Sequence, residues 1–92
     1  MTKRELIARV AAAEHITFKE AELAVKTILG SMELALQDED RIEIRGFGSF
    51  KVKWYPGYQG RNPRTGDSIQ VKSKKLPLFR AGKELKERVN QG

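Results

Sequence analysis

A proline-centred turn between two alternating segments constrains the fold of this chain more than any other feature of the sequence. In the segment Gly60–Gly66, Asn62 suits the first position of a β-turn, and Pro63 presets the backbone for the second. Polar and apolar residues alternate over 51–54 before the turn and over 68–72 after it. Alternation on both sides of a turn predicts a β-hairpin. Two strands of about ten residues would reach roughly 34 Å, so we expect a projecting arm.

The two faces of this predicted arm differ in chemistry. Because side chains alternate across a strand, one face would carry lysines and the other would carry apolar side chains. The basic face would hold Lys51, Lys53, Lys72 and Lys74, and the apolar face Val52, Trp54, Ile69 and Val71.

The chain is short for a fold that stands alone. Its 92 residues predict a single domain. An arm over about 54–75 leaves about seventy residues for a core. A core of that size ordinarily needs a cross-link such as a disulfide, or a partner chain, to be stable. The sequence has no cysteine, so no disulfide can cross-link the chain. We therefore expect a second chain to supply buried area, and we interpret the protein as cytoplasmic, with no signal peptide and no membrane span.

Charge is divided unequally along the sequence. Residues 1–44 carry a net charge of −3 and residues 45–92 a net charge of +9, within a total of +6. A merely solvated basic surface would not require such a division. The asymmetry favours contact between the second half of the chain and a polyanion.

Two capping boxes predict the N-terminal helices. In Thr2–Glu5 and in Thr17–Glu20, a threonine lies three residues before a glutamate, the pattern that closes a helix N-terminus. Apolar residues at helical spacing extend the first helix to about Glu14 and the second to the acidic turn at 38–40. The second helix is apolar over so broad an arc that it must bury two sides, one against the first helix and the other against a second subunit.

The remaining segments predict an antiparallel sheet and a last helix. A strand over 41–45 and a glycine-rich stretch over 46–50 precede the arm, and Pro77 marks a strand end or edge after it. A short helix follows over about 83–90. We expect three aromatic residues in the core: Phe47, Phe50 and Phe79. Two helices, three strands and a helix make an α+β fold.

Nothing in the sequence predicts an enzyme. His15 is the only histidine and lies at a predicted helix end, where we interpret it as a surface residue. One histidine without cysteine excludes the usual zinc ligand sets. The glycines of 46–48 do not open a helix after a strand, as a dinucleotide fingerprint requires. We expect no cofactor, no metal and no small-molecule substrate.

The basic arm suits duplex DNA. Side chains that neutralise phosphates release counterions and bind strongly with little sequence choice, a role that fits Lys51, Lys53, Lys72, Lys74 and Lys75. Pro63 is apolar and rigid, and Arg61 and Arg64 flank it, so the crown can act as a wedge at a minor-groove base step. Pro63 alone fits a simple turn proline equally well; the surrounding charge favours the wedge.

Four segments, taken together, carry a family resemblance. They are Thr2–Ile7, Gly46–Phe50, Gly60–Gly66 and Gly82–Leu85. Over essentially all 92 residues, the chain resembles the HU and integration host factor family of bacterial nucleoid proteins, which are themselves standard examples of minor-groove binders that bend DNA. The stretch Arg41–Phe50 is most similar to the integration host factor β branch.

The resemblance implies an architecture. It is an α+β fold of two N-terminal helices, a three-stranded antiparallel sheet with a long protruding β-ribbon arm, and a short C-terminal helix, assembled as an intertwined dimer. Within one DNA-binding domain of residues 1–92, the helical dimerisation part would span about 1–40, the sheet and arm about 41–79, and the C-terminal helix about 82–90.

The resemblance also implies roles for particular residues. Arg45 would read the minor groove beside Gly46, with Glu43 orienting it, although a surface ion pair of Glu43 with Arg45 fits the sequence too. Pro63 would intercalate, with minor-groove contacts from the other tip residues: Arg61, Asn62, Arg64, Thr65 and Gly66. Phosphates would be clamped on the body by Lys3, Arg80, Lys83 and Lys86. The implied partners are double-stranded DNA and a second subunit, identical or α-like. The implied roles are nucleoid compaction, recombination, replication and transcription.

One stretch departs from the family pattern. Tyr55 and Tyr58 stand where relatives often carry arginine, so two phosphate contacts per arm lack their usual side chains. The aromatic residues leave two other hypotheses open. One is a basic protein that stacks RNA or single-stranded bases on Trp54, Tyr55 and Tyr58; the other is an interaction protein whose arm binds an acidic partner.

Overall fold

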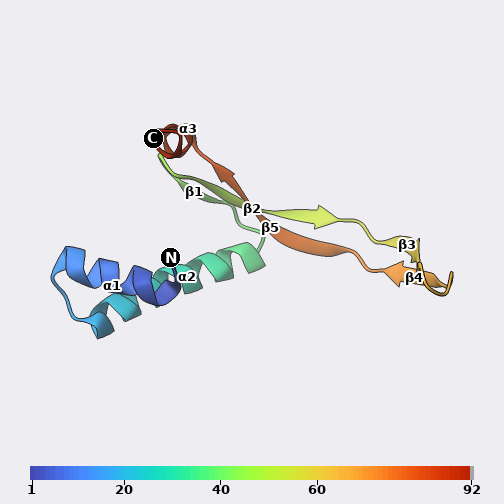
Figure 1. The fold of residues 1–92 in the computed structure, drawn as a ribbon, viewed down its shortest axis with the longest axis horizontal. Coiled ribbons are helices and arrows are strands. Elements are labelled where there is room, and N and C mark those ends of the chain that lie inside the picture. Colours follow the sequence, from blue (N-terminus) through green and yellow to red (C-terminus); the bar gives the residue numbers. More distant parts are fainter. Residues whose placement is uncertain (92) are drawn as a thin grey trace. The chain divides into compact units, whose positions relative to one another are not determined.

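The computed structural model describes residues 1–91, and its internal contacts divide the chain into two compact units, Met1–Ala35 and Leu36–Gly92. The first unit is helical and holds α1 (Lys3–Glu14) and most of α2 (Phe18–Gln37). The second holds the strands and the last helix. Figure 1 labels these elements along the chain.

The predicted capping box at Thr17–Glu20 forms in full, whereas the one at Thr2–Glu5 forms only its threonine half. The Thr2 hydroxyl accepts a hydrogen bond from the Glu5 amide at 3.1 Å. At the start of α2 the bonds are reciprocal, because the Thr17 amide donates to the Glu20 carboxylate at 3.0 Å and the Glu20 amide donates to the Thr17 hydroxyl at 3.1 Å. The backbone hydrogen bond from Thr17, followed by its side chain, lowers the pKa of the Glu20 carboxyl, since both favour the charged form. The expected helix starts are confirmed.

The helical unit buries little. Its buried side chains are Ile7, Ala21 and Val25, with Leu6 and Val10 packed partly against them. Other apolar residues of α2 face solvent: Leu23, Ile28 and Leu34 are 69%, 60% and 64% exposed. One apolar side of α2 thus meets α1, and the other is uncovered in the single chain.

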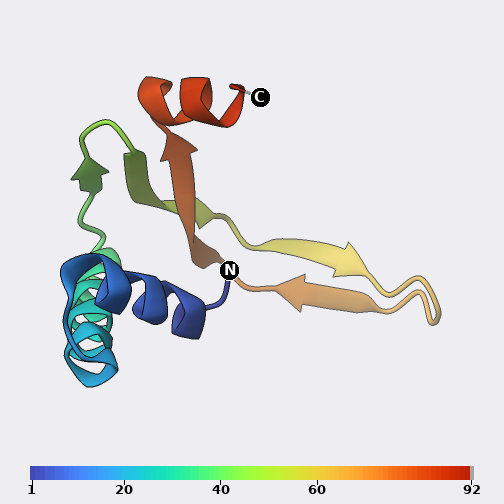
Figure 2. The same cartoon turned by 60° about the vertical axis from the view of Figure 1, so that its left-hand side comes forward.

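The second unit contains a three-stranded antiparallel sheet in the order β1-β2-β5. Its strands are β1 (Ile42–Ile44), β2 (Gly48–Tyr55) and β5 (Lys74–Ala81), and α3 (Lys83–Val89) follows directly. Figure 2 shows α3 at the end of the sheet opposite the arm. The expected α+β order of two helices, a three-stranded sheet with an arm and a last helix is confirmed.

The arm is interrupted midway. Its outer part is a two-stranded ladder of β3 (Tyr58–Arg61) and β4 (Ser68–Val71), separated from β2 and β5 by residues 56–57 and 72–73. The continuous ten-residue strands predicted from alternation are therefore two shorter ladders in series. Pro56 cannot donate to a ladder. A Cβ on Gly57 would lie 2.6 Å from the Val71 carbonyl oxygen, so the backbones approach there as closely as glycine allows.

The strand register sorts the side chains into two faces. Directly paired residues of antiparallel strands point to the same side of a sheet. What we call the cationic face holds Glu43, Ser49, Lys51, Lys53, Tyr55, Lys74, Leu76, Leu78 and Arg80. What we call the apolar face holds Ile42, Ile44, Phe50, Val52, Trp54, Lys75, Pro77 and Phe79. The predicted placement of Lys51, Lys53 and Lys74 on one face is confirmed, whereas Lys72 lies in the interruption, outside both ladders.

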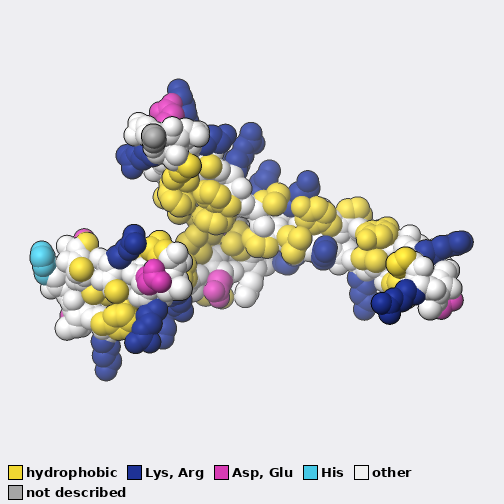
Figure 3. Space-filling view, viewed as in Figure 1, with side chains coloured by type: hydrophobic (Ala, Val, Ile, Leu, Met, Phe, Trp, Pro, Cys, Tyr) yellow, Lys and Arg dark blue, Asp and Glu magenta, His cyan; other side chains and the backbone are white. Residues whose placement is uncertain are grey.

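The three phenylalanines predicted for the core do cluster. The ring centroid of Phe79 lies 5.5 Å from that of Phe47 and 4.8 Å from that of Phe50. In the single chain they are not buried, since Phe47 is 43% and Phe79 44% exposed. Figure 3 shows hydrophobic side chains running along this part of the sheet. Within residues 1–91, no helix combines the length and the apolar character that a membrane crossing needs.

Candidate nucleic-acid interface

Asn62 organises the tip of the arm. Its amide donates to the Asp67 carbonyl at 2.9 Å, and its own carbonyl accepts from the Gly66 amide at 2.8 Å. Its side-chain oxygen accepts from the Arg64 amide at 2.9 Å. The turn predicted from Asn62 and Pro63 is present, but its closing bond reaches one residue further than in a β-turn. Gly66 has a φ of +75°, which favours glycine at that position.

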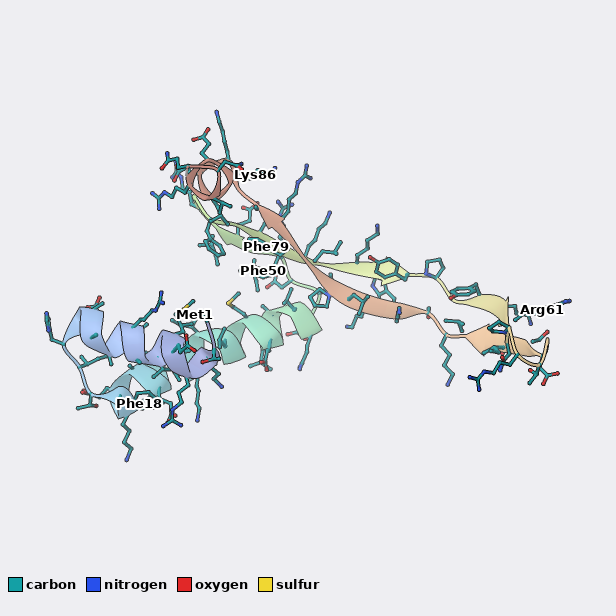
Figure 4. The ribbon with its side chains drawn as sticks, in the orientation of Figure 1. Met1, Phe18, Phe50, Arg61, Phe79 and Lys86 are labelled. Carbon is teal, nitrogen blue, oxygen red and sulfur yellow. The ribbon has the colours of Figure 1, made fainter. Side chains whose placement is uncertain are left out.

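This turn leaves Pro63 at the crown. Pro63 is exposed, and so are Arg61 and Arg64 on either side of it. Figure 4 shows Arg61 at the end of the arm, directed away from the ribbon. Because the hydrogen bonds of Asn62 hold the backbone from within, the crown presents an apolar ring between two guanidinium groups. Exposed apolar side chains of this kind are the ones that minor-groove proteins insert between base steps.

The β1–β2 turn presents Arg45. The Phe47 amide donates to the Ile44 carbonyl at 2.9 Å, which places Arg45 and Gly46 in the middle of the turn. Gly46 has a φ of +82°, and a Cβ there would lie 2.8 Å from a carboxylate oxygen of Glu84. The positive φ therefore favours glycine, whereas the flexible Glu84 side chain could move aside, and Arg45 remains exposed.

A shallow groove brings the predicted body residues together. It is lined by the turn and by the adjoining ends of the sheet strands: Arg41, Glu43, Ile44, Arg45, Gly46, Gly48, Ser49, Arg80 and Gly82. Glu43 forms its salt bridge with Arg41, at 2.9 Å between Nη2 and Oε1. Both side chains are well exposed, so the pair contributes little to stability. A role for Glu43 in orienting Arg45 remains a prediction.

The basic residues predicted to hold phosphates fall into separate groups. Lys51, Lys53, Lys74 and Arg80 share the cationic face. Lys83 and Lys86 are exposed on α3, and Figure 4 labels Lys86 there. Lys3 begins α1 and belongs to the helical unit.

Lys75 is placed differently from the other lysines of the ribbon. It pairs with Trp54 in the ladder and so lies on the apolar face. Its ammonium group donates to the Gln37 carbonyl at 3.1 Å. Sequence alternation could have assigned Lys74 and Lys75 to opposite faces. The bond to Gln37 could not be predicted in this way, because it joins residues 38 positions apart.

Trp54 and Tyr55 do not form one stacking platform. Trp54 and Tyr55 are consecutive in β2, so their rings lie on opposite faces. Lys53 lies over the Tyr55 ring, with Nζ 5.3 Å from the centroid, and the Trp54 indole N–H donates to the Glu39 carboxylate. The geometry does not favour the single-strand stacking hypothesis, which requires rings aligned along one path.

These features define a class: a small α+β protein with a basic, proline-crowned β-arm. The chain belongs to the bacterial DNA-binding protein family, whose model matches residues 1–90. It is 55% identical over 91 residues to the integration host factor subunit beta of Laribacter hongkongensis, covering 98% of this chain and 92% of that protein. It is 53% identical to the same subunit of Vibrio atlanticus, covering 100% and 99%.

Solved structures agree with the sequence relatives. An HU–DNA cocrystal structure from Anabaena covers 100% of both chains with a TM-score of 0.88 and 32% identity. HU from Thermotoga maritima covers 98% of this chain and all of its own, with a TM-score of 0.71 and 33% identity. The resemblance read from the sequence is thereby confirmed.

Proposed function

We propose that this protein bends duplex DNA as an architectural component of the bacterial nucleoid, with the arm entering the minor groove and Pro63 wedging at a base step. The observation that carries the proposal is the exposed proline crown, held by Asn62 and flanked by Arg61 and Arg64. Membership of a DNA-binding family and likeness to an HU–DNA complex support it. The protein acts by binding, without catalysis, in the cytoplasm.

Binding draws on two kinds of contact. Cations of the cationic face and of α3 neutralise phosphates and set affinity without reading sequence. Arg45, in its groove beside Gly46 and Glu43, supplies the minor-groove contact that favours some sites over others, while Arg61, Asn62, Arg64, Thr65 and Gly66 contact the groove around the wedge. Bending then supports compaction, recombination, replication and transcription by bringing distant DNA segments together.

A second subunit completes the binding surface. The uncovered side of α2 and the half-exposed rings of Phe47 and Phe79 leave too little buried area for a chain of this size. A dimer, with an identical chain or a related α-like subunit, covers these side chains and presents two arms. Two wedges, one from each subunit, produce two kinks in the same duplex.

The test measures bending and affinity separately. A short duplex labelled at both ends for energy transfer should show its ends approaching when the protein binds. In Pro63→Ala the end-to-end distance should recover much of its unbent value while affinity changes little, because phosphate contacts are retained. Lys51→Ala is the matched control and should reduce affinity at a constant bend per complex. A bend identical in native protein and Pro63→Ala would reject the wedge.

A further inference from the structure

Side chains at the base of the arm form contacts that have no part in the proposed binding to DNA. Trp54 lies near the outer end of β2, and its indole N–H donates to the carboxylate of Glu39 in the turn after α2. The two residues are 15 positions apart, so this bond ties the ribbon to a separate element of the second unit.

Lys75 makes a parallel connection from the other strand. It pairs directly with Trp54, and its Nζ lies 5.7 Å from the centre of the indole ring. The same ammonium group donates to the carbonyl of Gln37, the last residue of α2. Helix C-terminal carbonyls lack partners within the helix and carry partial negative charge, so a lysine there is favourable.

The turn that receives both contacts has an uncommon backbone. Glu39 has a φ of 59°, in the left-handed region that few residues other than glycine occupy. The Glu39 amide donates to the Leu36 carbonyl at 3.0 Å, which closes the turn. This conformation costs free energy and persists where surrounding contacts hold it, and the bond from Trp54 is one such contact.

We propose that Trp54, Lys75 and Glu39 form an anchor that fixes the direction in which the arm leaves the sheet. The pair Trp54–Lys75 is followed by one further pair before the interruption at Pro56. An isolated two-stranded ribbon is only marginally stable in water. Contacts at the base of the arm are therefore needed to hold it in one direction. The three residues are positioning residues: they aim the wedge without touching DNA.

The anchor has a consequence for bending, and this part of the inference rests on the proposed function. If the arm leaves the body in one direction, Pro63 reaches the duplex at one distance from the body, and the kink falls at one position. If the anchor is broken, arms leave at a range of angles and complexes bend by a range of amounts. In this hypothesis Lys75 makes the DNA bend more uniform among complexes and does not contact a phosphate.

The test begins without DNA. The chain has no cysteine, so spin labels can be placed at Gln59→Cys on the arm and Glu87→Cys on α3, with labelled chains diluted into unlabelled protein. Lys75→Met and Glu39→Ala should each broaden the distance distribution. Losing a hydrogen bond to a charged group should raise the ratio of detached to anchored arms about fivefold, equivalent to roughly 1 kcal/mol.

Two controls separate the anchor from a general loss of charge or stability. Lys74→Met removes the same charge from the neighbouring residue on the cationic face and should keep the native distribution. Glu39→Gln retains an acceptor for the Trp54 indole and should restore most of it. Distributions for Glu39→Ala and Lys75→Met that match Lys74→Met would overturn the proposal.

A second stage uses the end-labelled duplex. Anchor variants should widen the spread of end-to-end distances at an unchanged mean affinity for duplex that is already bent. Pro63→Ala should instead straighten the duplex while leaving the DNA-free arm distribution native. A failed wedge and a failed anchor therefore give different results. Equal spreads of duplex distances in native protein and anchor variants would reject the link to bending.

Discussion

The cationic and apolar faces of the ribbon are built from the same two strands, yet they present opposite chemistry to their surroundings. On one side, Lys51 and Lys53 stand beside Lys74 and Arg80; on the other, Phe50, Val52 and Phe79 continue into Trp54. Along β2, successive side chains point to opposite faces, so each lysine is followed by an apolar residue of the other face. Under the proposed function, this difference lets one ribbon serve two partners at once, DNA on the cationic face and a second subunit on the apolar face.

The largest expected effect comes from the apolar face. Phe79→Ala should destabilise the assembled protein by about 3–5 kcal/mol, because a ring that is half exposed in one chain becomes buried between two. Thermal unfolding at several protein concentrations checks this, since dimer stability depends on concentration. Leu76→Ala is matched to it: Leu76 is 41% and Phe79 44% exposed, but Leu76 lies on the cationic face. Equal losses for the two variants would remove the distinction between the faces.

The cationic face predicts an effect on affinity and its salt dependence. Lys53→Ala should weaken binding to any duplex by roughly tenfold at low salt and reduce the slope of log affinity against log salt by about 1, because one phosphate contact is lost. Titrations at several salt concentrations measure both quantities. Lys75→Met, which removes a charge from the apolar face, should change the slope far less. The same slope change in both variants would contradict the assignment of faces.

A smaller effect should separate sequence preference from general attraction. Arg45→Ala should lower the ratio of affinities for a selected site and a random duplex by roughly fivefold, or about 1 kcal/mol, because a groove contact is lost. Arg41→Ala removes an equal charge from the same groove and should weaken both duplexes alike. Competition binding with the two duplexes gives the ratio. Uniform losses in Arg45→Ala would reject a reading role and leave Arg45 as another phosphate contact.

Local chemistry made much of this fold predictable. The capping boxes at Thr2 and Thr17, the turn at Asn62 and Pro63, and the alternation around it depend on residues close together in sequence. The interruption of the arm was harder to predict from the sequence, because the effect of Gly57 depends on its close approach to the Val71 backbone across the ribbon. Lys75 and Trp54 were assigned by type, as a phosphate contact and an apolar side chain, and their bonds to Gln37 and Glu39 depend on the tertiary fold.

The predicted aromatic core shows a related limit. Phe47, Phe50 and Phe79 cluster as expected, but a single chain leaves Phe47 and Phe79 about half exposed. Hydrophobicity in a sequence predicts that a side chain will be covered, and does not say by which chain. The same holds for the broad apolar arc of α2, of which one side meets α1. Roles for individual DNA-contacting residues, and the single-domain organisation, remain predictions.

A crystal structure of the assembled protein with a duplex long enough for both arms would show directly whether Pro63 bends DNA. We expect a strongly bent duplex, with the Pro63 ring between unstacked base pairs in the minor groove and the cationic face against phosphates. A straight duplex of uniform stacking, with Pro63 in solvent, would contradict it.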